Sequence, residues 1–426
     1  MAVFAAIFLL SYWWPGFYGI TWVAVLGWIV LMLFELIMLY SSKGIKGERI
    51  LPEKFSNSDE NPVQLQLQNL YAFEARIAII DELPVQFQKR DFLSTEKISG
   101  KQRRTVSYSV RPIERGEYLF GNLNLYVSSV IGLVRRRYTF NKAQMVKVYP
   151  SFIQMKKYDF LAIDNRLTQL GLKKIRRIGH TMEFEQIKEY VPGDDVRTVN
   201  WKSTAKHGRL MVNQYQDEKM QPVYSLIDTS RVMKMPFEGL KLVDYAINSA
   251  LAFSNIALKK GDKVGLVDFS HTIGNILAAQ AKKTHLQTIL ETLYNSDTKF
   301  LDADYGALQA MVKRRIPHRS LLLLYTNFEH ISALHRQLPY LQAIARKHVL
   351  VVIFFENTEL KQLLGEEASN LPEIFDQTIA QQFESDKKVM VRELQQRGIQ
   401  TVLTSPQNLT VNTINKYLEI KSRGLL

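Results

Sequence analysis

The sequence contains no cysteine, and this absence excludes several kinds of site at once. Disulfide bonds, thiolate metal ligands, iron–sulfur clusters and a cysteine nucleophile all require that residue. Motifs of common enzyme classes are also missing: there is no G-x-x-x-x-G-K-[ST] or G-x-G-x-x-G phosphate loop, no H-E-x-x-H and no G-x-S-x-G. We therefore expect a protein that is not an enzyme and needs no organic cofactor.

The composition bounds the size and the partners of the molecule. A chain of 426 residues with 46% hydrophobic content can bury several cores, so two or three domains are expected. The net charge of +14 favours an anionic surface, either lipid headgroups or nucleic acid. No nucleic-acid-binding fold accompanies the basic cluster Arg135–Arg137. A nucleic-acid partner is therefore not expected, although nucleic-acid binding stays open as an alternative function.

The N-terminal region is the longest apolar part of the chain. Phe17 to Tyr40 provides the ~20 residues that a membrane-spanning helix needs. Ala2 to Trp14 is apolar but shorter, and Trp13-Trp14-Pro15-Gly16 is typical of a turn at headgroup level. Residues 1–40 are thus predicted to form a transmembrane hairpin whose first helix is truncated or only partly inserted. Glu35, the single charge in the span, is expected to snorkel or to face a neighbouring helix.

Basic residues follow the predicted span. Lys43, Lys46, Arg49 and Lys54 lie within the window in which positive charge sets orientation, and they place the rest of the chain in the cytoplasm. The predicted location is the inner (cytoplasmic) membrane, with residues 41–61 as a linker.

Residues 62–150 show short alternating segments without helical periodicity. This pattern predicts an antiparallel β-sandwich. The expected strands are 63–68, 76–80, 105–110, 118–120, 123–127 and 145–149.

Residues 221–426 alternate apolar strands with amphipathic helices. Runs such as LLLLY and VLVVIFF are typical of strands that are covered on both faces. The pattern predicts a doubly wound, mostly parallel, Rossmann-like α/β sheet. The expected strands are 223–227, 263–269, 320–325, 348–355 and 399–403, and the expected helices are 239–259, 281–294, 305–315, 331–347, 380–397 and 411–420.

Residues 151–220 contain a polar segment that leads into the first of these strands. It carries Tyr190, Gly193, Asp194, Asp195, Arg197, Trp201, Lys206 and Glu218. In these residues the segment resembles the signature of the bacterial domain-of-unknown-function family 58, which precedes a von Willebrand factor A-like domain. The resemblance implies a MoxR-type AAA+ ATPase as the partner, and envelope maintenance or stress response as the setting.

The signature residues have two interpretations. Asp194, Asp195 and Arg197 could recruit a partner, or they could form an internal ion-pair network above a packed Trp201. We favour the second interpretation and expect Trp201 to lie between the signature segment and the sheet.

A degenerate metal site is the second candidate. In the family that this region resembles, an Asp-x-Ser-x-Ser loop and residues after a later strand hold a divalent cation. Here Asp228 and Ser230 match, but Val232 offers no oxygen, and Thr326-Asn327 stands where an aspartate is common. Two remaining ligands hold Mg²⁺ poorly. In the alternative interpretation, Asp228 caps the following helix or turn and Ser230 hydrogen-bonds locally.

The sequence thus predicts a membrane-anchored, non-enzymatic adaptor that binds another protein. The alternatives are a metal-dependent enzyme or a divalent-cation-binding adhesion-type module that uses Asp228, and the nucleic-acid-binding protein already named.

Overall fold

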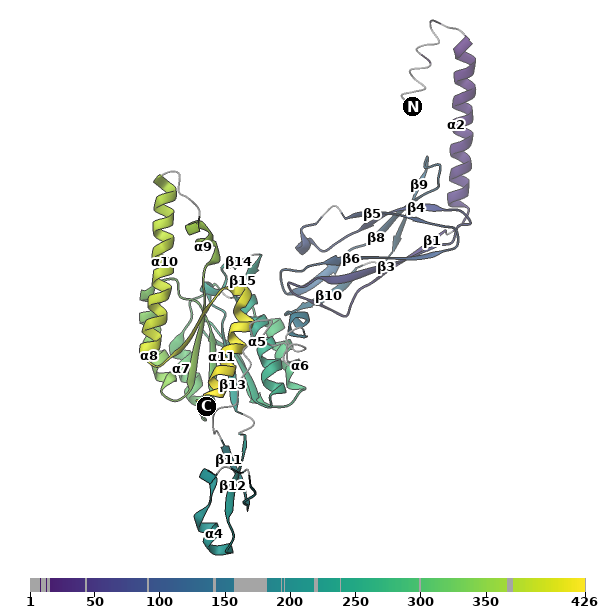
Figure 1. Ribbon diagram of the computed structural model, residues 1–426. Coiled ribbons are helices and arrows are strands. Elements are labelled where there is room, and N and C mark those ends of the chain that lie inside the picture. Colours follow the sequence, from purple (N-terminus) through teal and green to yellow (C-terminus); the bar gives the residue numbers. More distant parts are fainter. Residues whose placement is uncertain are drawn as a thin grey trace. The chain divides into compact units, whose positions relative to one another are not determined.

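The computed structural model describes residues 8, 13, 16–42, 44–89, 92–140, 143–156, 182–192, 194, 196–217, 221–237, 239–298, 300–365 and 371–425. The chain forms two compact units, Met1–Val148 and Tyr149–Leu426. Figure 1 shows the elements of both.

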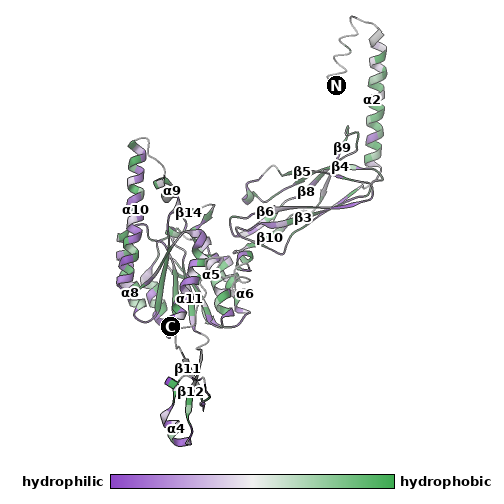
Figure 2. Ribbon diagram, in the orientation of Figure 1, coloured by the Kyte–Doolittle hydropathy of each residue, from purple (hydrophilic) through white to green (hydrophobic). Residues whose placement is uncertain are grey.

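The first unit begins with the apolar helix α2 (Gly16–Tyr40). Residues Tyr18–Tyr40 are long and apolar enough to cross a membrane. The helix is hydrophobic along most of its length (Figure 2), and it exposes large side chains such as Val23, Leu26 and Phe34. The residues of the predicted second span therefore form one helix. Most of the predicted first helix of the hairpin lies outside the described residues.

Glu35 does not snorkel, and it does not face another helix. Its carboxylate is fully buried and accepts hydrogen bonds from Ser129 Oγ (2.5 Å) and from the backbone N–H groups of Gly132 (3.1 Å), Leu133 (2.8 Å) and Val134 (3.0 Å). A loop that converges its N–H groups on one point is a good host for an anion. Glu35 thus fixes α2 to the β-rich part of the same unit.

Strands fill the rest of the first unit. They form two three-stranded sheets and one four-stranded sheet, in the orders β1-β3-β6, β2-β10-β7 and β5-β4-β8-β9. The strands are β1 (Ile45–Ile50), β2 (Lys54–Ser56), β3 (Asn61–Asn69), β4 (Ala75–Asp81), β5 (Leu93–Ile98), β6 (Arg103–Val110), β7 (Gly116–Phe120), β8 (Leu123–Ser128), β9 (Arg135–Phe140) and β10 (Gln144–Tyr149).

The sheets pack as a β-sandwich, as predicted. Buried side chains alternate with exposed ones along β3, and Leu65 and Leu67 share a core with Ile77 of β4 and Leu125 of β8. Residues 45–56, expected to belong to a linker, instead form β1 and β2. Their sequence has no clear alternation, and they become strands because β3 and β10 offer them pairing edges.

A buried ion pair joins β1 to β4. Arg49 Nη2 lies 2.7 Å from Asp81 Oδ1, both side chains are inaccessible, and Tyr108 Oη donates to Asp81 Oδ2 at 2.5 Å. Arg49, counted above among the basic residues that set orientation, is therefore a structural residue of the sandwich.

The second unit contains a hairpin and an α/β sheet. The hairpin consists of β11 (Met182–Glu189), α4 (Trp201–His207) and β12 (Met211–Asp217). The other strands are β13 (Pro222–Asp228), β14 (Pro236–Phe237), β15 (Leu240–Lys241), β16 (Lys263–Phe269), β17 (Ile273–Gln280), β18 (Leu321–Tyr325), β19 (Val349–Phe355) and β20 (Gln400–Thr404). The other helices are α5 (Leu242–Lys259), α6 (His285–Asn295), α7 (Tyr305–Arg315), α8 (Ile331–Ala345), α9 (Thr358–Gly365), α10 (Leu371–Gln396) and α11 (Leu409–Ser422).

The sheet has six strands in the order β17-β16-β13-β18-β19-β20. All neighbours are parallel except β17, an antiparallel edge strand that was not predicted. Alternate residues of β18 enter two different cores, Leu321 and Leu323 on one face and Leu322 and Leu324 on the other. Helices on both faces explain why the run LLLLY is apolar throughout.

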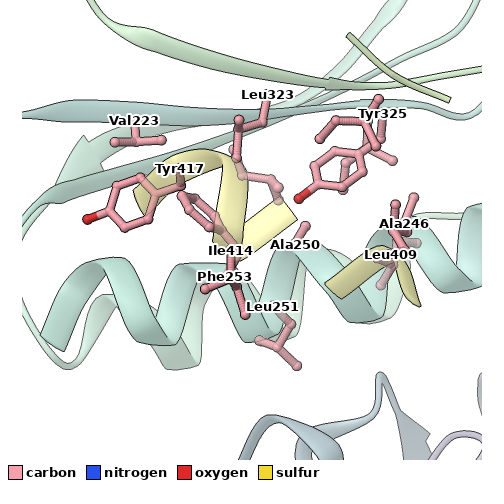
Figure 3. Packing of buried hydrophobic residues seen from close by; sticks show 14 of the residues in the cluster. Val223, Ala246, Ala250, Leu251, Phe253, Leu323, Tyr325, Leu409, Ile414 and Tyr417 are labelled. Atoms are coloured by element: carbon pink, nitrogen blue, oxygen red, sulfur yellow. The ribbon is translucent and has the colours of Figure 1, made fainter. Parts of the chain in front are cut away.

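Helices α5 and α11 cover one of these faces. Small residues such as Ala246 and Ala250 let α5 approach the strands closely, and Phe253 of α5 meets Tyr417 of α11 with ring centroids 5.2 Å apart (Figure 3). Helices α7, α8 and α10 contribute to the core on the opposite face. The sheet is thus held rigidly from both sides, and the loops at its ends are available for a site.

Candidate functional site

The loops after β13 and β18 meet at the carboxyl ends of these two neighbouring strands. The chain leaves β13 toward β16 on one side, whereas β18, β19 and β20 lie on the other side. At such a reversal, the carboxyl ends of the two central strands border the place where α/β proteins bind ligands. Asp228 ends β13, and Thr326 follows β18 directly.

A short hydrogen-bond chain links these two loops. Thr326 Oγ1 donates to Asp228 Oδ2 (2.7 Å), and the Ser230 backbone N–H donates to Asp228 Oδ1 (2.8 Å). Tyr305 Oη, from α7, lies 2.7 Å from Thr326 Oγ1. Both oxygens of the Asp228 carboxylate are therefore engaged within the protein.

Burial dominates the electrostatics of these hydrogen-bonded residues. Asp228 and Thr326 are fully inaccessible, and Tyr305 is nearly so. Burial raises the pKa of Asp228 above its ordinary value, while hydrogen bonding from Ser230 and Thr326 opposes that change. Burial also raises the pKa of Tyr305, and the nearby Asp228 carboxylate raises it further.

The structure brings together three of the four predicted metal-site residues: Asp228, Ser230 and Thr326. Asn327 instead accepts a 2.6 Å hydrogen bond at Oδ1 from Lys387 Nζ. Val232 packs against the hydrophobic core. Asp302 pairs with Arg231 at 3.5 Å, and Asp304 caps α7 through the Ala307 N–H.

The residues present do not fit Mg²⁺. This ion needs several oxygen ligands, and usually one or more carboxylates, with lone pairs directed at it. Asp228 has both oxygens occupied, Asn327 Oδ1 faces an ammonium group, and among the described residues no group of three or more His, Cys, Asp or Glu side chains could hold a metal ion. In this arrangement Asp228 accepts one hydrogen bond from its own loop, from the Ser230 N–H, and one from Thr326 on the loop after β18.

A pocket of about 570 Å³ lies beside Asn327. Its walls come from the ends of β19 and β20, from α9 and from α10, and they are mainly apolar, with Phe355, Leu360, Ala380 and Phe383 among them. Hereafter "the pocket" means this cavity. The pocket was not predicted because the expected helix began at residue 380, whereas α10 begins at Leu371. Apolar residues four apart at 371, 375, 379 and 383 could have indicated the longer helix.

Lys387 is a partly buried cation that lines the pocket. Besides Asn327, its Nζ donates to the Phe328 carbonyl oxygen at 2.5 Å. Burial lowers the pKa of Lys387 from 10.5 to about 8, although Glu329 acts in the opposite direction. Four acidic side chains also line the pocket: Glu329, Glu356, Asp376 and Glu384.

The signature residues lie on the β11–α4–β12 hairpin. Tyr190 donates its N–H to the Leu210 carbonyl oxygen (2.8 Å), and Asp194 accepts from Lys188 Nζ (2.9 Å) and the Val191 N–H (3.0 Å). These contacts hold the pKa of Asp194 below its usual value. Gly193, Asp195 and Glu218 lie outside the described residues.

Trp201 is exposed, so the prediction that it packs against the sheet was wrong. It begins α4 with 73% of its surface accessible, and Arg197 and Lys206 are exposed as well. The described residues of the hairpin form two strands and one short helix, which provide no second layer under which an indole could be buried. Trp201 therefore belongs to a surface.

Comparisons with known proteins agree with the signature. Residues 186–398, half of the chain, match the family model described as "Protein of unknown function DUF58". The uncharacterized protein YeaD of Bacillus subtilis (strain 168) is 23% identical over 299 residues, which cover 68% of this chain and 71% of that protein.

Two solved β-domains are also similar to parts of the chain. A PapD-like domain of human CEP192 covers 25% of this chain and 86% of its own, with 11% identity and a TM-score of 0.20. The CARDB domain of PF1109 from Pyrococcus furiosus covers 24% and 91%, with 14% identity and a TM-score of 0.18. Likenesses at this level carry no argument about function.

Proposed function

Because the chain belongs to the DUF58 family of proteins of unknown function, a name that assigns no activity, we propose a function from its site. The protein is a membrane-anchored adaptor that binds another protein through its α/β unit and catalyses no reaction itself.

The pocket is the observation that carries this proposal. It combines an apolar interior with an acidic rim at the carboxyl ends of the strands, which suits the docking of a protein segment. The adjacent polar residues are poor candidates for catalysis. Both carboxylate oxygens of Asp228 accept hydrogen bonds, from the Ser230 N–H and from Thr326 Oγ1, and Lys387 Nζ donates to Asn327 Oδ1.

The architecture supports a von Willebrand factor A-like, Rossmann-like assignment for this unit. Helices on both faces of the sheet, the reversal between β13 and β18, and the Asp228-Thr229-Ser230 loop at that reversal are the features that such a domain would have. In this chain the hydrogen bonds from Ser230 and Thr326 occupy the oxygens of Asp228. We therefore propose that the unit binds partners without a bridging metal ion.

Helix α2 supports the membrane anchor. From Gly16 to Phe34, at ~1.5 Å per residue, the helix reaches about 28 Å, close to the ~30 Å hydrocarbon core of a bilayer. Glu35 then begins the contact with the loop at residues 129–134, so the anchor and the sandwich would move together. Lys43, Lys46 and Lys54 favour a cytoplasmic location for both units, at the inner membrane.

The proposed partner is a MoxR-type AAA+ ATPase, which the family resemblance implies. The test is a pull-down of the full chain from detergent-solubilised membranes, comparing wild type with the pocket variant Ile379→Glu. Ile276→Glu, on β17, is the matched control, because the two isoleucines are 37% and 40% exposed. We expect an AAA+ ATPase to be retained by wild type and by the control. Absence of any AAA+ ATPase among the specifically retained proteins would refute the partner.

A further inference from the structure

The N-terminal half of α10 exposes an apolar stripe that leads into the pocket. Leu371, Phe375 and Ile379 are spaced four apart, on one side of the helix, and are 81%, 66% and 37% exposed. Phe383 continues the stripe as part of the pocket wall. An apolar surface that is continuous with a pocket is typical of an interaction site.

The rim of this surface is acidic in a chain whose net charge is +14. Of the two lysines at the pocket, Lys387 is directed to Asn327 and to the Phe328 carbonyl oxygen, and Lys388 pairs with Glu384 at 2.9 Å. Glu329 and Asp376 are exposed. The surface therefore favours an occupant with apolar and basic side chains.

The same chain carries a surface of that chemistry. Residues 196–210, hereafter the tip of the hairpin, contain four basic side chains and no acidic one. Val196, Trp201 and Leu210 are 69%, 73% and 46% exposed. Lys202 and Lys206 are exposed on the same short helix as Trp201.

Local hydrogen bonds hold the tip in one conformation. Asn200 Oδ1 accepts from the Ser203 N–H (3.0 Å) and so caps α4, and Thr204 Oγ1 accepts from the Met211 N–H (3.0 Å). Gly208 ends α4 in the left-handed conformation, with φ of 66°. A preorganised loop loses little conformational entropy on docking.

We propose that the pocket receives the tip of the hairpin from a second copy of this chain, with Trp201 entering the apolar interior and Lys202 and Lys206 facing the acidic rim. A cavity of about 570 Å³ has room for an aromatic side chain together with its neighbours. The contact joins two different surfaces, so repeated copies form a ring or an open chain. The inference rests on the proposed function of the α/β unit as a protein-binding unit and assigns the pocket to self-association, so Ile379→Glu should lose the ATPase only together with self-association.

The absence of cysteine allows a direct crosslinking test. Full-length Ile379→Cys is mixed with full-length Lys202→Cys in detergent micelles and treated with a short bismaleimide. Ile276→Cys replaces Ile379→Cys in the control mixture. We expect the 379–202 product to exceed the 276–202 product by about tenfold, since only surfaces in specific contact hold their thiols within reach.

Charge reversal provides an independent test. Lys202→Glu with Lys206→Glu should lower self-association in sedimentation equilibrium, and adding Glu329→Lys with Asp376→Lys on the other copy should restore it. Trp201→Ala should weaken self-association by about thirtyfold or more, as truncation of a central interface tryptophan does. Circular dichroism checks that each variant is folded.

Three results would overturn the inference. The first is equal crosslinking at positions 379 and 276. The second is crosslinking only when both cysteines are in one chain, which would mean that the tip docks on its own pocket. The third is loss of ATPase retention by Ile379→Glu with unchanged self-association, which would assign the pocket to the ATPase and leave the proposed function intact.

Discussion

Replacement of Asp228 by Asn should leave the α/β unit as stable as wild type, or more stable, near neutral pH. The Asn oxygen can accept from the Ser230 N–H, and its amide can donate to Thr326 Oγ1, whose proton can then turn to Tyr305 Oη. Both hydrogen bonds survive, and a fully buried charge is removed.

Asp228→Ala should behave differently, because it removes the acceptor and keeps the donors. The Ser230 N–H is then buried without a partner, while Thr326 keeps Tyr305, so the expected loss is about 2 kcal/mol. Since all five tryptophans lie at positions 13, 14, 22, 28 and 201, tryptophan fluorescence does not report on this sheet. Hydrogen exchange of the amides of β13 and β18 in the full chain provides the measurement.

The pH dependence has a definite sign. The folded-state pKa of Asp228 is raised, so wild type loses stability relative to Asp228→Asn as the pH rises through that folded pKa. The difference should vanish below the ordinary aspartate pKa. An Asp228→Asn protein as unstable as Asp228→Ala, or a wild-type protein that Mg²⁺ stabilises at micromolar concentration while Asp228→Asn does not respond, would refute the reasoning.

Three further predictions concern helix α2, the sandwich and the pocket. Glu35→Gln should accelerate hydrogen exchange at Gly132–Val134 by about tenfold or more, because hydrogen bonds to a charged acceptor contribute ~1.5–3 kcal/mol; unchanged exchange would mean that the carboxylate does not hold this loop. Arg49→Met should destabilise the sandwich by about 3–5 kcal/mol, because Asp81 is left buried without its partner, and Arg49→Met with Asp81→Leu should recover most of that loss in thermal unfolding. The pKa of Lys387 is lowered to about 8 in the folded state, so between about pH 8 and 10.5 the unfolded chain binds more protons than the folded chain. The free energy of unfolding should therefore rise with pH across this window in wild type, and rise less in Lys387→Met. Equal slopes of the free energy of unfolding against pH in the two proteins would contradict the burial of this charge.

Much of the architecture was predictable from local sequence patterns. The run from Phe17 to Tyr40 is apolar over the length of a membrane span, the alternation in residues 63–68 matches the pleat of β3, and the run 321–325 is apolar because both faces of β18 are covered. These properties depend on residues close together in the chain. Edge elements such as β1, β2 and β17 were missed, since their conformation depends on a pairing neighbour more than on their own residues.

The positions of the polar residues were decided by tertiary structure. The sequence by itself marked Asp228 and Thr326, but only the register of β13 beside β18 puts them in hydrogen-bond contact across 98 positions of the chain. Glu35, which was expected to snorkel or to face a neighbouring helix, is instead buried as the acceptor of a loop, and among the described residues no layer covers Trp201. Spacing along a chain determines which residues share a strand or helix face, whereas the folding of distant segments against one another determines which of those faces meets protein and which meets solvent.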